Sequence, residues 1–401
     1  MKRNTAILCA ALLAAVSVAA FVFIFPAGGP ALPGTSILDD APKPAHTQPD
    51  TMEKIEPKEE EAARGTHQMD PLIASMTREE QVAQLFWVRC PDEGAAELVQ
   101  TYQPAGYVLF GRDFENKSRE EVAQTVQSYQ AAAKIPLLIG TDEEGGTVVR
   151  ASANRALRRW PFESPQRVYE RGGLHEVEAD TAEKDRFLQG LGVNVNLAPV
   201  ADVSTDAKDF IYPRTMGKGA QETADYVGVV VRTMKNDGMG TVLKHFPGYG
   251  SNGDTHAGAV TDTRPAERFH EADFLPFRAG IRQGADAVLV SHTIVQVFDA
   301  AHPASLSPNI HQILREELGF QGVIVTDDLA MEALALPEGE AAVQAVQAGN
   351  DLLLSSNFAV QYQAVLNAVN QGQISENTLY YALRRVLQWK SDLGLLQAEG
   401  A

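Results

Sequence analysis

The stretch Gly240-Thr-Val-Leu-Lys-His-Phe-Pro-Gly-Tyr-Gly250 begins like a strand and ends like a loop. Its first half is a short apolar run bounded by glycine, which is typical of a buried strand. The run breaks at a proline–glycine pair and enters a glycine-rich loop with unusual backbone freedom. Lys244 and His245 stand where the strand ends, and Asp254 and His256 follow in the loop. We therefore expect this strand to deliver a cation, two imidazoles and a carboxylate to one place.

Short apolar runs of the same kind recur along the chain, with helical patterns between them. They occupy residues 86–89, 106–110, 136–140, 193–200, 240–244, 287–290, 322–325 and 351–354. Residues 120–133 and 220–237 are examples of the helical patterns. Strands that alternate with helices in this way predict an α/β fold, a single (β/α)8 barrel of the TIM type. A doubly wound open sheet is the alternative, but it would need a glycine-rich phosphate loop after the first strand, where the sequence has none.

Polar and charged residues follow most of the predicted strands. They include Asp142 after the third strand, Lys244 and His245 after the fifth, His292 after the sixth and Asp327 after the seventh. Active sites of such barrels form at the carboxyl ends of the strands, from several strands at once. The pattern therefore predicts one shared site at this end of the barrel.

The first residues carry a targeting signal. Lys2 and Arg3 precede an apolar run over residues 6–25, which is long enough to cross a bilayer as a helix. A signal peptide cleaved after the Val-Ala-Ala of residues 18–20 is the alternative. We expect residues 1–25 to be a signal anchor or a signal peptide. Either one places the rest of the chain outside the cytoplasm, anchored to the membrane or secreted.

The region after this segment changes composition twice. Residues 26–69 are rich in proline, glycine, threonine and charged residues and have few apolar ones. A chain of this composition cannot form a core, so it predicts a disordered linker. Residues 70–398 contain all the predicted strands and helices, and we expect them to form the barrel domain.

Composition limits the partners. The 401 residues include 44% hydrophobic ones, enough for a large core, and carry a formal net charge of −18. This charge argues against nucleic acid, and it leaves the N-terminal segment as the only expected membrane contact. Cys9 and Cys90 cannot form a disulfide framework, because Cys9 lies in the leading apolar segment. The sequence leaves the oligomeric state open.

The loop motif identifies a family. Lys-His-Phe-Pro-Gly at residues 244–248, followed by Asp-Thr-His at residues 254–256, resembles the signature of family 3 glycoside hydrolases in their β-N-acetylhexosaminidase branch. In that branch an Asp-x-His pair on a mobile loop supplies the general acid/base. The resemblance therefore implies that His256 is the acid/base and that Asp254 orients its ring. An imidazole suits this work because it titrates near neutral pH.

A second segment agrees with this resemblance. Gly-Val-Ile-Val-Thr-Asp-Asp-Leu-Ala-Met at residues 322–331 resembles the family's segment after the seventh strand, whose first aspartate is the nucleophile. The resemblance implies that Asp327 attacks the anomeric carbon and forms a covalent intermediate. The structural alternative for Asp327 is a helix N-cap, although the adjacent Asp328 could take that role. The family's β-glucosidases have Asp-Trp here, so the Asp-Asp-Leu of this chain favours the hexosaminidase branch.

A third segment implies the sugar-binding residues. Ile-Gly-Thr-Asp-Glu-Glu-Gly-Gly-Thr-Val-Val-Arg at residues 139–150 is similar to the family's Asp-Gln-Glu-Gly-Gly-Arg-Val-x-Arg, and a Pro-Arg-Thr-Met-Gly motif follows at residues 213–217. The residues that match sugar-binding positions, or that would join them, are Asp142, Arg150, Arg214, Lys244 and His245. Buried ion pairing is the competing explanation for Asp142 and Arg150. Two departures, Thr147 for an arginine and Tyr249 for a histidine, affect the expected substrate preference.

The function that follows from the resemblance is a retaining exo-β-N-acetylglucosaminidase that acts on peptidoglycan-derived or related glycans, with no metal or organic cofactor. A metal-dependent amidohydrolase is the alternative from another class, because His245 and His292 end neighbouring strands. That site would need a His-x-His pair after the first strand, which the sequence lacks. The sequence also fits a non-catalytic glycan-binding barrel or a phosphorolytic enzyme, and it does not separate hydrolysis from phosphorolysis.

Overall fold

The computed structural model describes residues 68–334 and 336–396. The predicted N-terminal segment 1–25 and nearly all of the predicted linker 26–69 lie outside these residues. The described residues belong to one compact unit, Arg64–Ala401. Within them, no helix is both long enough and apolar enough to cross a membrane.

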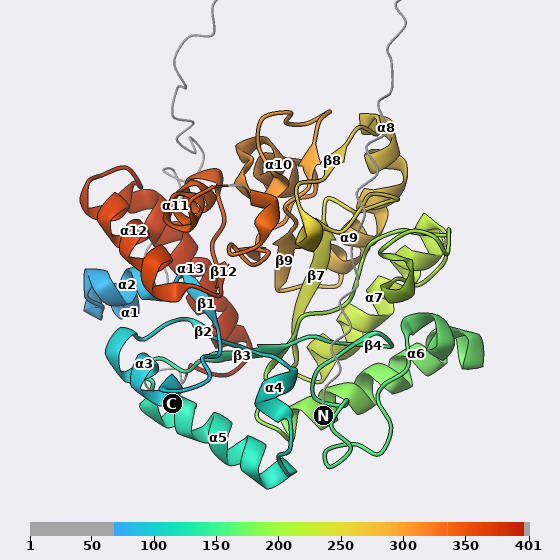
Figure 1. Cartoon of the computed structure of the whole chain (residues 1–401), viewed down its shortest axis with the longest axis horizontal. Helices are drawn as coiled ribbons and strands as arrows, with labels where there is room; N and C mark the ends of the chain where they lie inside the picture. The colour runs from blue at the N-terminus through green and yellow to red at the C-terminus, as the bar shows by residue number, and fades with distance from the viewer. Residues whose placement is uncertain (1–67, 335, 397–401) are drawn as a thin grey trace, which may run out of the picture. The chain divides into compact units, whose positions relative to one another are not determined.

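Eight parallel strands form the central sheet (Figure 1). They are β1 (Phe86–Arg89), β2 (Gly106–Leu109), β3 (Leu138–Thr141), β6 (Val195–Asn196), β7 (Gly240–Phe246), β9 (Ala287–Val290), β11 (Val323–Thr326) and β12 (Leu353–Ser355). Their order in the sheet is β11-β9-β7-β6-β3-β2-β1-β12. All eight predicted strands are confirmed, because each apolar run overlaps one of them.

The sheet curls until its two edge strands, β11 and β12, nearly meet. An isolated parallel bridge joins Val325 to Leu352. Two backbone hydrogen bonds support it, from Thr326 N to Leu352 O at 3.1 Å and from Asp351 N to Ile324 O at 2.8 Å. The sheet is therefore a nearly closed parallel barrel, consistent with the TIM type and not with the open doubly wound alternative.

Helices follow the strands in the expected alternation. They are α1 (Asp70–Ser75), α2 (Arg78–Ala83), α3 (Ala95–Tyr102), α4 (Gly111–Phe114), α5 (Arg119–Ala132), α6 (Pro165–Gln189), α7 (Ala220–Asn236), α8 (Ala266–Arg268), α9 (Phe274–Arg282), α10 (Pro308–Gln312), α11 (Glu338–Ala348), α12 (Phe358–Asn370) and α13 (Glu376–Asp392). Capping boxes open α2 at Thr77 and α5 at Ser118. In each box the hydroxyl accepts a backbone N–H and a glutamate accepts the return bond, which satisfies two donors that the helix leaves free.

Two side-chain layers make up the core. Inward-facing residues fill the barrel around Trp87, which packs edge-on against Trp389 of α13 at 5.8 Å between ring centroids. Gly140 allows this packing, because a Cβ there would lie 2.2 Å from the Trp87 ring. Residues that alternate with them, such as Phe86 and Ile139, face the helices instead. Successive side chains of a strand point to opposite faces of the sheet, and this alternation produces both layers.

Short elements extend the loops at the carboxyl ends of the strands. After β3, the strands β4 (Glu143–Gly145) and β5 (Val148–Val149) form an antiparallel hairpin. The loops after β7 and β9 pair through β8 (Thr261–Asp262) and β10 (Ile294–Val295). The short helices η2 (Tyr212–Arg214), η3 (Thr255–Ala257) and η7 (Glu332–Leu334) belong to the same set of loops. Of the predicted site residues, Arg214 and His256 lie in these short elements, and Asp142, Arg150 and Asp254 lie directly next to them in the chain.

Candidate active site

An irregularity in β7 turns two neighbouring side chains toward one network. Leu243 pairs with Val288, but Phe246 pairs with Val290, so β7 has one residue more than β9 between these positions. In a regular strand, successive side chains point to opposite faces. A bulge changes that direction, and here both Lys244 and His245 contact the same charged cluster.

Lys244 and Arg214 meet at a shared carboxylate, that of Glu144. The Lys244 ammonium lies 2.7 Å from Glu144 Oε1 and 2.7 Å from Asp142 Oδ1. Arg214 donates to both oxygens of Glu144, from Nε at 2.9 Å and from Nη2 at 2.7 Å. Glu144 is therefore the centre of the cluster, and the sequence prediction did not include it. Its spacing of two from Asp142 was the available signal, because residues at i and i+2 of an extended chain share a face.

The two carboxylates of the cluster are held in the ionised form. Burial works to raise the pKa of Asp142, but the Lys244 and Arg150 charges more than offset it, so this pKa lies below its usual value. Burial also opposes ionisation of Glu144, and Lys244 and Arg214 overcome it, which depresses the pKa of Glu144 strongly. Glu144 in turn raises the pKa of Arg214, against the effect of burial. The cluster is thus a fixed array of charges. Its cationic side chains can donate hydrogen bonds to hydroxyl groups, and its carboxylates can accept hydrogen bonds from them.

His245 is fixed by Asp202, which was not among the predicted site residues. The ring nitrogen Nδ1 lies 2.8 Å from Asp202 Oδ2, and the backbone N–H of His245 donates to the same oxygen at 3.1 Å. Nε2 lies 3.1 Å from Nη2 of Arg214, which can only donate. The contacts therefore assign the proton to Nδ1 and make Nε2 an acceptor. His245 positions Arg214 and has no free nitrogen for acid/base work in this arrangement.

Arg150 joins the cluster from the β4–β5 hairpin. Its Nη2 lies 3.6 Å from Asp142 Oδ2, and its guanidinium lies over the Phe110 ring at 5.5 Å from the centroid. All five predicted sugar-binding residues are therefore brought together. The ion-pair explanation for Asp142 and Arg150 also holds, because the two side chains do pair. Their binding role stays a prediction.

Asp327 follows β11 directly, on the same side of the barrel. Its backbone N–H donates to Val290 O of β9 at 3.0 Å, and its Oδ1 accepts from Asp328 N at 2.9 Å. The N-cap alternative is wrong for both aspartates, because the next α-helix, α11, starts only at Glu338. Asp328 instead binds the backbone of Ala330 and the loop after β12. Asp327 is half-buried and commits one carboxylate oxygen to this turn.

The loop with Asp254 and His256 lies beside the loop of the predicted nucleophile. Its short helix η3 packs against η7, which follows β11. Asp254 is half-buried, and its carbonyl accepts from Ala257 N at 3.1 Å. The side chain of His256 lies outside what the structure describes. The contact between the two loops is consistent with one site that contains residues of both. The catalytic roles of Asp254, His256 and Asp327 stay predictions.

Tyr249 connects this loop to the base of the site. Its hydroxyl lies 2.6 Å from the Thr255 hydroxyl, and both side chains are buried. Its backbone N–H donates to Asp202 at 2.7 Å, and its ring packs edge-on against His245. Burial raises the pKa of Tyr249, and the nearby charge of Asp327 raises it further, so the hydroxyl stays protonated. Tyr249 is where the sequence departs from the histidine that is usual in the family motif.

The metal-enzyme alternative requires His245 and His292 as metal ligands, but both rings form hydrogen bonds within the protein. His292 bonds the Ser305 hydroxyl through Nδ1 at 2.7 Å and the Asp328 carbonyl through Nε2 at 2.9 Å. A carbonyl only accepts, so Nε2 carries the proton. Among the residues that the structure describes, no group of three or more histidine, cysteine, aspartate and glutamate side chains is arranged to hold a metal ion.

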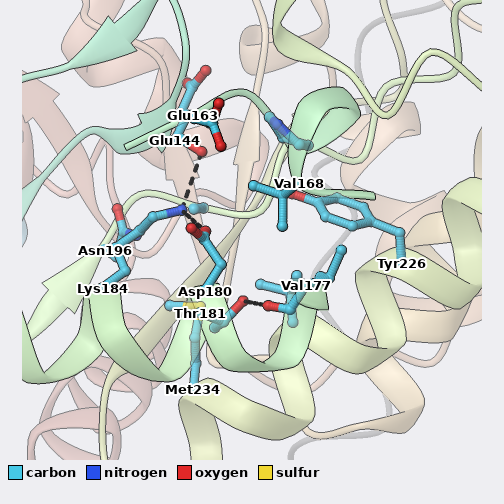
Figure 2. Close-up of a pocket in the computed structure, with 13 residues that line it drawn as sticks. Glu144, Glu163, Val168, Val177, Asp180, Thr181, Lys184, Asn196, Tyr226 and Met234 are labelled. Carbon is cyan, nitrogen blue, oxygen red and sulfur yellow. Dashed lines mark hydrogen bonds and ion pairs between the residues drawn. The ribbon is translucent and has the colours of Figure 1, made fainter. Parts of the chain in front are cut away.

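A small cavity lies behind Glu144, between the barrel and the helices α6 and α7 (Figure 2). Its volume is about 20 Å³. Lys184 points into it and contacts the Glu144 carbonyl and the Asp180 carboxylate, each at 3.3 Å. A cavity of this size holds a single water molecule and no sugar. A larger cavity of about 340 Å³ lies at the opposite, amino-terminal ends of β9 and β11, away from every predicted site residue.

Comparisons with known proteins identify relatives of this chain. A family model described as "Glycosyl hydrolase family 3 N terminal domain" matches residues 77–389. The Beta-hexosaminidase of Xanthomonas campestris pv. campestris (strain B100) is 36% identical over 234 residues, which are 57% of this chain and 69% of that protein.

Solved structures of family 3 glycoside hydrolases have a similar fold. A glycoside hydrolase family 3 β-N-acetylglucosaminidase from Paenibacillus sp. str. FPU-7 matches with a TM-score of 0.75 and 30% identity, over 82% of this chain and 64% of that chain. This chain thus spans a little under two thirds of that relative. A family 3 glycosyl hydrolase from Mycobacterium smegmatis str. MC2 155 matches with a TM-score of 0.71 and 29% identity, over 79% of this chain and 98% of that one.

Proposed function

Since this chain belongs to glycosyl hydrolase family 3, we propose that it is a retaining exo-β-N-acetylglucosaminidase that removes terminal N-acetylglucosamine from peptidoglycan-derived or related glycans. Membership of the family makes it a glycoside hydrolase. The hexosaminidase names of its relatives support the sugar, and the N-terminal apolar segment supports a location outside the cytoplasm, where such glycans occur.

One observation carries the proposal: the loop with the Asp254–His256 pair packs against the loop that follows Asp327. A retaining glycosidase needs a nucleophile and an acid/base on the two sides of one glycosidic bond. The charged cluster around Glu144 stands at the same ends of the strands and supplies donors and acceptors for sugar hydroxyls.

In the proposed first step, a carboxylate oxygen of Asp327 attacks the anomeric carbon. His256 donates a proton to the glycosidic oxygen as the bond from that oxygen to the anomeric carbon breaks. The sugar is then bound covalently to Asp327, and the aglycone leaves as an alcohol. In the second step, His256 takes a proton from water, the water oxygen bonds to the anomeric carbon, and Asp327 is released. Asp254 orients the imidazole and stabilises its charged form, as the carboxylate does in a catalytic triad.

The test is covalent trapping. We expect incubation with a 5-fluoro N-acetylglucosaminyl fluoride to add one glycosyl mass to the intact protein, and peptide mapping to locate it on Asp327. Asp327→Ala is expected to abolish turnover of an aryl N-acetyl-β-glucosaminide and to prevent labelling. Asp328→Asn, the matched neighbour, should keep the label. Labelling on another carboxylate, or turnover that persists in Asp327→Ala, would refute the assignment.

The same assay separates the competing functions. A non-catalytic glycan-binding barrel would neither turn over the aryl glycoside nor accept the label. A metal-dependent enzyme would lose activity in a chelator, whereas we expect activity to persist. Product analysis in phosphate buffer distinguishes N-acetylglucosamine from its 1-phosphate, and we expect the free sugar.

A further inference from the structure

Trp160 is exposed on the surface of an ordered loop. It is 60% exposed, more than any other large hydrophobic side chain among the described residues. Two arginines face its ring, with the Arg155 guanidinium 5.9 Å and the Arg159 guanidinium 5.6 Å from the ring centroid. We propose that these three side chains, named here the Trp160 patch, form a secondary binding surface for an anionic glycan.

The charge of the patch is available to a ligand. Arg155 and Arg159 are exposed, and neither forms an ion pair with any described residue. Arg158, between them, is different: it pairs with Glu183 at 2.8 Å and lies over the Phe162 ring at 4.0 Å. Of these neighbouring arginines, one is therefore used to hold the loop and two keep their charge for solvent or a partner.

The loop is built to present the patch in one conformation. The buried Glu143 carboxylate accepts the backbone N–H groups of Arg150 at 3.0 Å and Ala151 at 2.8 Å. Asn154 donates from its side chain to the carbonyls of Phe114 at 2.7 Å and Lys117 at 2.9 Å. A preordered surface loses less conformational entropy when a ligand binds.

The segment that carries the patch is basic on an otherwise acidic chain. Residues 150–171 contain six arginines and two glutamates, whereas the whole chain carries a formal net charge of −18. Four of these six arginines pair with carboxylates, which leaves Arg155 and Arg159. At physiological salt the screening length is about 8 Å, so a ligand at the patch responds mainly to these two charges. The distant acidic residues therefore do not prevent the approach of an anion.

The ligand chemistry follows from the side chains. A guanidinium pairs with carboxylate or phosphate oxygens through two parallel hydrogen bonds, and an exposed indole packs against an apolar face. The apolar C–H face of a pyranose ring that carries an anionic group satisfies both. Sugar is favoured over nucleic acid because the substrate proposed for this enzyme is itself a glycan. This last step rests on the proposed function.

The experiment measures binding of the full chain to immobilised polygalacturonate, which carries carboxylates, and to phosphomannan, which carries phosphates. Trp160→Ala and the double variant Arg155→Gln/Arg159→Gln are each expected to weaken binding about tenfold, as loss of a principal contact does. The control is Arg268→Gln/Arg282→Gln, which removes two other exposed arginines without ion pairs to described residues and causes the same change in charge. It should bind like the unchanged chain. The polymer that binds more tightly identifies the anionic group.

Three results would overturn the proposal: equal loss in the control variant, no loss in the patch variants, or binding of polyglutamate or single-stranded DNA as tight as that of the glycans. Melting temperatures of the variants establish that they fold. Turnover of the aryl N-acetylglucosaminide should be unchanged by the patch substitutions. A chain without turnover that still binds through the patch would refute the proposed function but not this surface.

Discussion

Glu144 organises the charged cluster because its two oxygens serve two cations. Lys244 and Arg214 both lie 2.7 Å from Glu144 Oε1, and without this carboxylate the two cations would repel each other. Burial removes water from the group, so its charge is balanced by the protein alone. The cluster is consequently preorganised, which suits the proposed role of rejecting ligands that lack matching hydroxyl groups.

The hydrogen bond between Tyr249 and Thr255 gives a prediction about the loop. Tyr249→Phe removes a buried bond that holds the loop to the base of the site. We expect kcat to fall about fivefold, corresponding to about 1 kcal/mol. Thr255→Val should act similarly, and the double variant should add little, since both changes delete one interaction. Tyr169→Phe, whose hydroxyl has no partner among the described residues, is the control. Fully additive losses would show that the bond is not the cause.

Asp254 gives a second prediction at this scale. Asp254→Ala is expected to lower kcat while KM changes little, because the role proposed for this carboxylate is to orient the acid/base and not to hold the sugar. If the proposal is right, this substitution also removes a negative charge beside the general acid, which disfavours the protonated form of that acid. The basic limb of the pH–rate profile, which reports loss of the acid form, should then move to lower pH. An unmoved limb, or a large rise in KM, would contradict the orienting role.

Among the elements, α6 carries a buried carboxyl group without a hydrogen-bond partner. Neither oxygen of Asp185 has one among the described residues, and the side chain is fully buried. Burial raises the pKa of Asp185 from its usual 3.8 to about 8, although the nearby Lys184 charge opposes the rise. The group is therefore protonated in the folded protein at neutral pH.

This protonation predicts a pH-dependent stability. The folded-state pKa of Asp185 exceeds the unfolded one, so its effect on stability is most favourable below pH 3.8. The free energy of unfolding should then decline as pH rises towards about 8. Asp185→Asn removes this decline, so the stability of this variant relative to the unchanged chain should grow across the interval, by at most about 6 kcal/mol. Denaturant unfolding at several pH values measures it, with the exposed Asp225→Asn as control. A constant difference would refute the assignment.

At the scale of the whole barrel, the weakest seam lies between β11 and β12, where one isolated bridge joins the edges. Asp351 reinforces it. Its carboxylate accepts from Arg315 at 2.6 Å, from Arg385 at 3.0 Å and from the backbone of Ile324 at 2.8 Å. The side chain thus ties α13 and the loop before β12 to β11.

Loss of the Asp351 carboxylate should weaken the contact between β11 and β12 that closes the barrel. We expect Asp351→Asn to lower the free energy of unfolding by about 3 kcal/mol, because it removes the buried negative charge that Arg315 and Arg385 share. Urea unfolding measures the change, and the exposed Asp392→Asn should leave stability within about 0.5 kcal/mol. Equal stability of the two variants would show that the backbone bridge alone closes the barrel.

The strands and the residues at their ends were predictable because the signals are local. An apolar run of a few residues between helical patterns identifies a strand, and the polar residue after it lies at the carboxyl end whatever the rest of the chain does. The capping boxes at Thr77 and Ser118 were equally local, and the structure contains both. The helix N-cap considered as the structural alternative for Asp327 was wrong, because a turn and η7 come between β11 and the next α-helix.

What the sequence determined by itself is therefore the alternation of strands and helices, the family motifs and the set of residues that gather at one end of the barrel. The tertiary structure alone decided how these residues pair: Glu144 with Lys244 and Arg214 in ion pairs, Asp202 with His245, and Tyr249 with Thr255 in hydrogen bonds. The physical reason is that such contacts join residues far apart in the chain. They depend on the closure of the barrel and on an extra residue in β7, which no short-range pattern encodes.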